Sequence, residues 1–193
     1  VDRTEIMYND FLVVGPVEDQ LHLANEKTVG AVFLKIHDNK ALFLSRGDES
    51  GTHKKELALW QIAGVTPDDS WYREVGQGMG KTLQIAGELG AYTITDRGTW
   101  VFARENLPLR IVFQGDPPLF NQYSIIAVNP QRHDINYEGA TSLIQWISGE
   151  KGQRMIDNYR IKGEKLFNAN AGSAGLEAGS EVKSEVRSEM ESG

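Results

Sequence analysis

The chain has 193 residues, 40% of them apolar, and a formal net charge of −7, so its length allows one large domain or two small lobes and its acidity argues against a nucleic acid partner. It has no cysteine, which excludes a disulfide framework, a thiolate metal site and a cysteine nucleophile. Its four histidines lack metal-ligand spacing, and no apolar run approaches the roughly 20 residues of a membrane span.

Hydrophobic patterning predicts strands that alternate with helices along most of the chain. In chain order we expect a strand or strand pair at residues 6–15, a helix at 20–37, a strand at 41–44, helices at 50–63 and 80–89, strands at 91–95, 109–113 and 123–128, and helices at 138–147 and 150–159. This alternation predicts an α/β fold with a mostly parallel sheet.

The C-terminal stretch, residues 171–193, differs in composition from everything before it. It consists largely of Ala, Gly, Ser and Glu, and repeats a Ser-Glu-Val-Lys-like unit. Such a composition favours a disordered, solvated tail. The spacing of Val182, Val186 and Met190 leaves a thin amphipathic helix as the alternative.

The segment between the strand at 41–44 and the helix at 50–63 has the composition of an anion site. The first N–H groups of a helix lack intrahelical partners, and the helix dipole favours negative charge there. Ser50 and Thr52 add hydroxyl donors, Gly51 permits close backbone approach, and Arg46 supplies a charged fork suited to a tetrahedral oxyanion. An ordinary serine-capped helix is the simpler reading, but these features crowd into one turn, so we favour the anion site.

A second glycine-rich turn, residues 76–82, ends in Gly-Lys-Thr and resembles a nucleotide-binding loop. Val75 stands where that motif requires glycine, so we do not expect a nucleotide there. We expect instead that Gly78 and Met79 begin a helix and offer N–H groups to the same anion, the alternative being a tight turn that needs glycine. The run Asp96-Arg97-Gly98-Thr99 follows a strand, where open α/β sheets place ligands, but we favour a turn in which an Asp-Arg pair caps the next segment.

Taken in order, these segments resemble the tungstate-binding receptor family of ABC importers, which has the type II periplasmic binding protein fold. The resemblance covers about Val1 to Phe167. Its motifs are Met7-Tyr8-Asn9-Asp10-Phe11 with Gly15-Pro16, Ser45-Arg46-Gly47-Asp48 with Ser50-Gly51-Thr52-His53-Lys54-Lys55-Glu56-Leu57, Gly76-Gln77-Gly78-Met79-Gly80, Ala91-Tyr92-Thr93 with Thr95-Asp96-Arg97-Gly98-Thr99, and Asn121 with Val128-Asn129-Pro130.

The resemblance implies two α/β lobes joined by two crossing strands, with the oxyanion held in the cleft. Residues 1–15 and 120–170 would form a partial lobe 1, residues 16–119 lobe 2, and residues 171–193 the tail. The first half of lobe 1, present in family members, would be missing from this chain.

The resemblance also implies which residues bind the anion. These are Ser45, Arg46, Ser50, Gly51, Thr52, Gly78 and Met79. In the similar turn of phosphate receptors, an aspartate at the position of Asp48 accepts the proton of phosphate. Tungstate and molybdate carry no such proton, so we expect Asp48 to face away, and to pair with Arg46 or cap the helix.

The function that follows is a periplasmic or otherwise extracytoplasmic receptor that captures tungstate or molybdate and delivers it to an ABC permease. No cofactor, no metal and no catalytic set are expected, so the chain is not read as an enzyme. Two alternatives stay open: a receptor for phosphate or another oxyanion, and the ligand-sensing domain of a transcription regulator.

Overall fold

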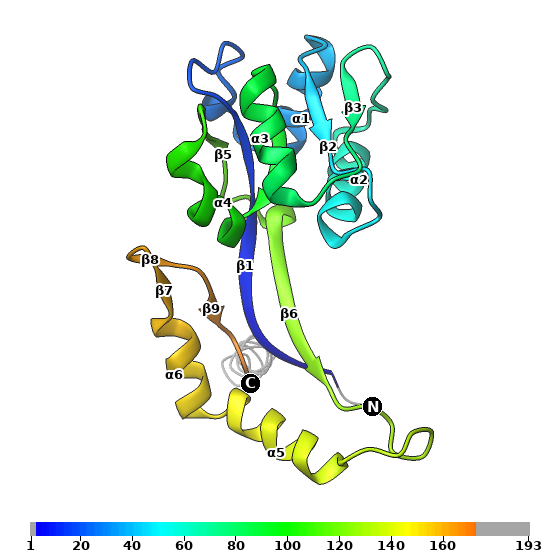
Figure 1. Cartoon of the computed structure of the whole chain (residues 1–193), viewed down its shortest axis with the longest axis vertical. Helices are drawn as coiled ribbons and strands as arrows, with labels where there is room; N and C mark the ends of the chain where they lie inside the picture. Colours follow the sequence, from blue (N-terminus) through cyan, green and yellow to red (C-terminus); the bar gives the residue numbers. More distant parts are fainter. Residues whose placement is uncertain (1–2, 173–193) are drawn as a thin grey trace, which may run out of the picture. The chain divides into compact units, whose positions relative to one another are not determined.

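The computed structural model describes residues 3–172, and these form two compact units. One unit contains the described residues up to Tyr8 and from Gln122 onward, and the other contains Asn9–Asn121. The chain passes between the units through strands β1 (Arg3–Pro16) and β6 (Phe120–Ile126), which pair with each other (Figure 1). The lobe boundaries 15/16 and 119/120 stay a prediction.

The larger unit is built on a twisted sheet around β1. Strand β1 lies between β4 (Thr93–Asp96) and β5 (Leu109–Phe113) and is antiparallel to both. Strands β2 (Phe43–Ser45) and β3 (Tyr72–Glu74) pair in parallel. A parallel bridge between Phe43 and Tyr92 joins the two sets in the order β3-β2-β4-β1-β5.

The expectation of a mostly parallel sheet is therefore wrong. Alternation of strands and helices implies parallel pairing only where a crossover helix joins neighbouring strands. That holds for β2 and β3, which α2 connects. Strand β1 instead enters the unit between β4 and β5, and no crossover helix sets its direction against either of them.

Strand β1 divides the core of this unit into two clusters, because successive side chains of a strand point to opposite faces. Phe11 and Val13 pack into one cluster, whereas Leu12 and Val14 pack into the other. The helices that cover the sheet are α1 (Val29–Asp38), α2 (Gly51–Ala63), α3 (Met79–Leu89) and α4 (Arg97–Ala103). Short 3-10 turns accompany them at Leu23–Asn25, Arg104–Asn106 and Pro117–Leu119.

The expected helix at residues 20–37 is wrong in its first half, because α1 begins only at Val29. Thr28 ends the preceding loop and its hydroxyl accepts a hydrogen bond from the Ala31 N–H at 3.3 Å. The Asp116 carboxylate, far away in the sequence, accepts one from the Val29 N–H at 2.6 Å. Thr28 is a local signal for this helix start, whereas the contact with Asp116, 87 positions from Val29, leaves none.

Asp116 should stabilise the larger unit through this contact. We expect Asp116→Ala to lower the free energy of unfolding by about 1–2 kcal/mol, because it removes both a cap and a negative charge at a helix start. Asp116→Asn should lose less, since an amide oxygen can still accept the bond. Urea denaturation measures the change, and the exposed Asp134→Ala serves as control. An Asp116→Ala variant as stable as the control would contradict the assignment.

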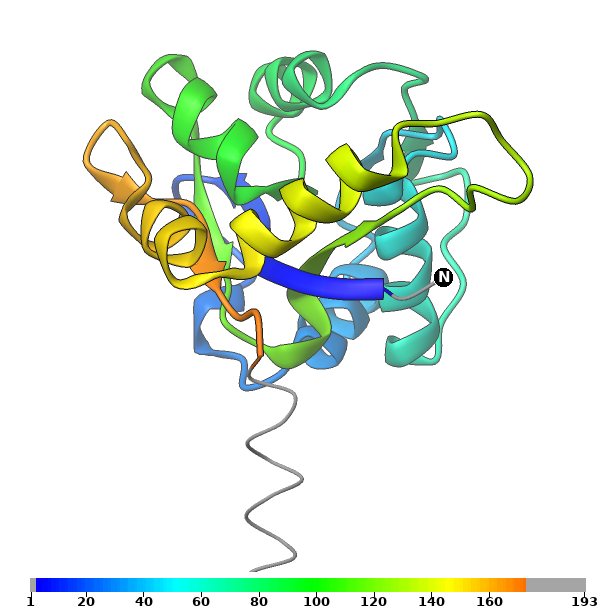
Figure 2. The same ribbon diagram turned by 90° about the horizontal axis from the view of Figure 1, so that it is seen from below.

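The smaller unit contains two consecutive helices, α5 (Tyr137–Ser148) and α6 (Glu150–Asn158), as expected (Figure 2). After them come three two-residue strands, β7 (Arg160–Ile161), β8 (Glu164–Lys165) and β9 (Asn168–Ala169); β7 pairs with β8, and β9 pairs with the start of β1.

Apolar side chains on these helices remain exposed among the described residues, notably Leu143, Trp146 and Met155. The predicted tail lies outside the described residues from position 173 onward. Over residues 3–172, no helix combines the length and the apolar character that a membrane span requires.

Candidate functional site

The turn between β2 and α2 begins and ends as the sequence predicts. Ser50 is the N-cap, and its hydroxyl accepts a hydrogen bond from the His53 N–H at 3.3 Å. Gly64 ends the helix in the left-handed conformation, which glycine adopts at little cost. The helix start therefore lies directly after the carboxyl end of a buried parallel strand, where α/β folds place ligands.

Arg46 and Asp48 form an ion pair within this turn. The Arg46 Nη2 donates to the Asp48 Oδ2 at 2.5 Å, and the Asp48 Oδ1 accepts from the Ser50 N–H at 3.2 Å. The hydrogen bonds from Ser50, helped by the charge of Arg46, hold the pKa of Asp48 below its usual value. The carboxylate thus fixes the guanidinium and the helix cap together.

One nitrogen of the Arg46 guanidinium, Nε, takes no part in this ion pair. The Nε of Arg46 is buried and has no hydrogen-bond partner within residues 3–172. An N–H donor that is buried without an acceptor costs free energy, so we expect a ligand to accept a hydrogen bond from it.

Glycine is required at position 47. Gly47 has a φ of 58°, and a Cβ atom added to it would lie 2.5 Å from the Cβ of Glu74. Glu49 also has a positive φ, of 56°, which side chains rarely adopt. The turn is therefore held in a strained, specific conformation, as is common at ligand sites.

The N–H groups at the start of α2 are available for a ligand. The N–H groups of His53 and Lys54 bond to Ser50, but in the described part of the chain those of Gly51 and Thr52 have no acceptor. The Thr52 hydroxyl likewise forms no hydrogen bond to another described residue. The two N–H groups are donors and the hydroxyl can donate, and all three lie at the start of the helix that follows the Arg46 turn.

The second predicted turn, residues 76–82, follows β3, the strand that pairs with β2. Strands β2 and β3 pair in parallel with Ser45 opposite Glu74, and the Val75 N–H donates to the Ser45 carbonyl at 3.0 Å. The chain then turns into α3, which begins at Met79 with Gly78 as N-cap. Gly78 and Met79 therefore start a helix at the same sheet edge as the Arg46 turn.

Ser45, by contrast, is fully buried and faces the interior. Its hydroxyl oxygen accepts a hydrogen bond from the Gly47 N–H at 3.2 Å, which supports the left-handed Gly47. The structure thus places Ser45 behind the turn, where it supports the backbone. Its predicted contact with the anion stays a prediction.

A buried carboxyl group behind the turn was missed by sequence reasoning. Glu56 is 1% exposed, and its Oε1 accepts hydrogen bonds from the Trp60 indole N–H at 3.0 Å and the Tyr72 hydroxyl at 2.8 Å. Burial raises the pKa of Glu56, against the opposing effect of hydrogen bonds from Ser45, Tyr72 and Trp60. The available signal was that Glu56 follows His53 and precedes Trp60 at helical spacing, on the buried face.

His53 occupies the same buried face, one turn before Glu56. Its Nδ1 accepts a hydrogen bond from the Glu49 N–H at 3.1 Å, which supports the second left-handed residue of the turn. Its Nε2 is buried, lies 3.6 Å from the Glu74 Oε1, and has no hydrogen-bond partner among the described residues. The His53 ring therefore stabilises the conformation of the turn from its buried side.

Asp96 and Arg97 begin α4 at the same sheet edge. The Asp96 carboxylate caps the helix by accepting from the Thr99 N–H at 2.8 Å, as expected. The Nε and Nη2 of Arg97 donate to the two Asp10 oxygens at 2.5 and 2.6 Å. A negative cap already occupies this helix start, so it is a poor anion site.

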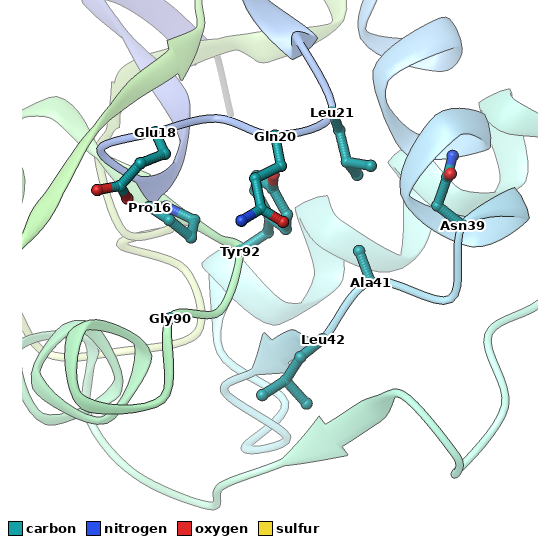
Figure 3. Close-up of a pocket in the computed structure, with 9 residues that line it drawn as sticks. All are labelled: Pro16, Glu18, Gln20, Leu21, Asn39, Ala41, Leu42, Gly90 and Tyr92. Atoms are coloured by element: carbon teal, nitrogen blue, oxygen red, sulfur yellow. The ribbon is translucent and has the colours of Figure 1, made fainter.

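A cavity of about 480 Å³ lies at the opposite edge of the sheet (Figure 3). Leu42 and Gly90, which line it, precede strands β2 and β4, whereas the predicted site residues follow β2 and β3. None of the predicted site residues is among the nine described residues that line this cavity. It is separate from the candidate anion site.

The described residues contain no group of three or more His, Asp or Glu side chains placed to hold a metal ion. The donors of the Arg46 turn suit an anion instead.

Two α/β units connected through a pair of strands, with helix starts gathered at one edge of the sheet, define the type II periplasmic binding protein fold. The chain belongs to the PBP superfamily, whose family profile, described as a PBP superfamily domain, matches residues 1–151.

Its relatives within this superfamily include tungstate-binding proteins. It is 48% identical over 177 residues to the tungstate-binding protein TupA of Peptoclostridium acidaminophilum, a match that covers 89% of this chain and 62% of that protein. The chain thus spans less than two thirds of the length of that relative.

Two solved structures agree with this relationship. The tungstate-binding protein TupA of Desulfovibrio alaskensis G20 is 40% identical with a TM-score of 0.79, covering 88% of this chain and 70% of that one. The tungstate ABC transporter structure from Geobacter sulfurreducens is 46% identical with a TM-score of 0.74, covering 82% and 68%.

Proposed function

We propose that this chain captures a tetrahedral oxyanion, tungstate or molybdate, outside the cytoplasm and delivers it to an ABC permease. The observation that carries the proposal is the Arg46 turn, in which a fixed guanidinium with a buried, unpartnered Nε adjoins the available N–H groups of Gly51 and Thr52. The names of the relatives support the choice of anion and of transporter class.

Each part of the turn would have a distinct task. Arg46 would donate to the anion while Asp48 holds it in place. The N–H groups of Gly51 and Thr52 and the Thr52 hydroxyl would bind further oxygens, aided by the dipole of α2. Gly78 and Met79 would contribute from the start of α3. Each of these groups can donate to the anion, which suits an anion that carries no proton.

Binding of the anion requires neither a cofactor nor a chemical step, because recognition rests on hydrogen bonds and charge alone. The proposed role is therefore that of a receptor and not of an enzyme. Its extracytoplasmic location is part of the same proposal, since an ABC importer takes up solutes from outside the cell.

Isothermal titration calorimetry at pH 7 tests the proposal directly. We expect tungstate to give a saturable one-site isotherm with the purified chain, and chloride to give none. A flat tungstate titration would overturn the proposed function.

A further inference from the structure

Glu56 is the one buried carboxyl group of α2, and the binding mode proposed above leaves it without a role. It lies five residues after Gly51, which places it about 7–8 Å further along the helix axis. Over residues 3–172 it forms no ion pair with a lysine or arginine. Its hydrogen bonds come from neutral donors, and within the described residues the charge that favours its ionised form is that of His53.

The hydrogen bonds of Glu56 leave room for a proton. Both the Trp60 indole and the Tyr72 hydroxyl bond to Oε1, so Oε2 can be protonated without the loss of either bond. The Ser45 hydroxyl also acts on this carboxyl group, and a hydroxyl can either donate to a carboxylate or accept from a carboxylic acid. Ser45 in turn accepts from the Gly47 N–H, which connects Glu56 to the turn.

A bound oxyanion would bring additional negative charge close to the Glu56 carboxylate. Tungstate and molybdate are dianions near neutral pH, and a like charge nearby disfavours the ionised form of a carboxyl group. The larger unit surrounds Glu56 with protein and not with water, so this repulsion is only partly screened.

We therefore propose, on the basis of the function proposed above, that oxyanion binding at the Arg46 turn is coupled to uptake of a proton from solvent by Oε2 of Glu56. The receptor would then hold its ligand more tightly as the pH falls, because a state that binds more protons is favoured at lower pH. Burial, which already raises the pKa of Glu56, brings this transition closer to neutral pH.

The other titratable groups around Glu56 do not replace it in this role. Tyr72 from β3 has its pKa raised by burial and by the charge of Glu56, so it stays protonated and can only donate. Glu74, also from β3, is largely exposed and lies beside His53. Arg46 and Asp48 on the turn neutralise each other. His53 is the remaining titratable group, but its Nδ1 already accepts the hydrogen bond from the Glu49 N–H, so uptake of a proton by this ring would break that bond.

Helix α1 and strand β4, which also pack against α2, place no side chain in a hydrogen bond or ion pair with Glu56 within the described residues. Helix α1 places the Phe33 ring against Trp60, with centroids 4.5 Å apart. Strand β4 contributes Thr93, whose hydroxyl donates to the Leu44 carbonyl at 2.7 Å.

Calorimetry with tungstate tests the coupling. At each of several pH values between 6.5 and 8, the titration is run in two buffers with different heats of ionisation, and the difference in heat gives the number of protons taken up. We expect uptake by the wild-type chain, together with affinity that rises as the pH falls. Glu56→Gln keeps the shape and an acceptor for Trp60, but it should abolish uptake and flatten the pH dependence.

Two further variants serve as controls. Glu88→Gln removes the same charge at an exposed position of α3 and should behave as the wild type. His53→Asn removes the imidazole while its amide oxygen can still accept from Glu49, and proton uptake should persist. Undiminished uptake in Glu56→Gln, or its loss in His53→Asn, would overturn the proposal.

A direct readout exists if Glu56→Gln fails to fold. The Trp60 indole N–H resonance reports the protonation of its Glu56 acceptor, and saturating tungstate should move its titration midpoint upward by about half a pH unit or more. An unmoved midpoint, with tungstate heat present, would refute the coupling while leaving the proposed function intact. Absence of tungstate heat would refute the proposed function itself, and the coupling with it.

Discussion

Arg46→Ala should weaken tungstate binding at least about tenfold. A charge-assisted hydrogen bond to an anion contributes about 1.5–3 kcal/mol, and each 1.4 kcal/mol corresponds to a factor of ten. The fold should be nearly unaffected, because the one hydrogen-bond partner of the guanidinium among the described residues is Asp48 of its own turn. Calorimetry gives the affinity, and thermal unfolding checks the stability.

Lysine at position 46 should restore only part of the affinity. An ammonium group is a point charge and cannot present two N–H donors in a rigid fork. It would also lack an equivalent of the buried Nε.

The matched control for charge is Arg73→Ala. Arg73 is an exposed residue of β3, the strand next to β2, so the same positive charge is removed close to the site without touching the turn. Its affinity for tungstate should stay within about twofold of the wild type, as expected for a screened surface charge. Equal affinities for Arg46→Ala and the wild type would remove Arg46 from the site.

The local signals in the sequence predicted α2 and α3 well. Ser50 before the helix and Gly64 after it are a cap and a terminator whose effect depends only on neighbouring residues, and Gly90 acts in the same way after α3. Because the groups proposed to bind the anion lie in the turns at these helix starts, the candidate site could be located from the sequence.

Features that depend on distant contacts could not be predicted. Strand β3 is three residues long with two exposed side chains, so it shows no alternation, and its partner β2 is almost 30 residues away. The start of α1 depends on Asp116. The direction of β1 depends on which strands it lies between.

The buried polar cluster was missed for a different reason. A glutamate in a helix usually points to solvent, and Glu56 is buried only because Tyr72 and Trp60 supply donors to it. One of these, Tyr72, belongs to the strand that the sequence did not reveal. Burial of a charged residue is thus a property of the assembled fold and not of its own segment.

Tungstate and molybdate should bind at least about a hundredfold more tightly than phosphate, with sulfate in between. Phosphate carries a proton near pH 7, and the N–H donors of the Arg46 turn and of the helix starts leave that proton facing another donor. Sulfate is unprotonated but smaller, so it satisfies the donors less well. Competition titrations against tungstate at pH 7 measure the order.

The expectation depends on Asp48, the carboxylate of the turn that pairs with Arg46. Both of its oxygens already accept a hydrogen bond, from Arg46 and from the Ser50 N–H, and its lowered pKa keeps it ionised at neutral pH. Asp48→Ala should therefore reduce tungstate affinity by freeing Arg46, without raising the affinity for phosphate. The exposed Asp69→Ala, which removes the same charge away from the turn, should leave both affinities unchanged. If phosphate displaced tungstate at comparable concentrations, and Asp48→Ala abolished that displacement, Asp48 would be the acceptor of the phosphate proton and the chain would be a phosphate receptor.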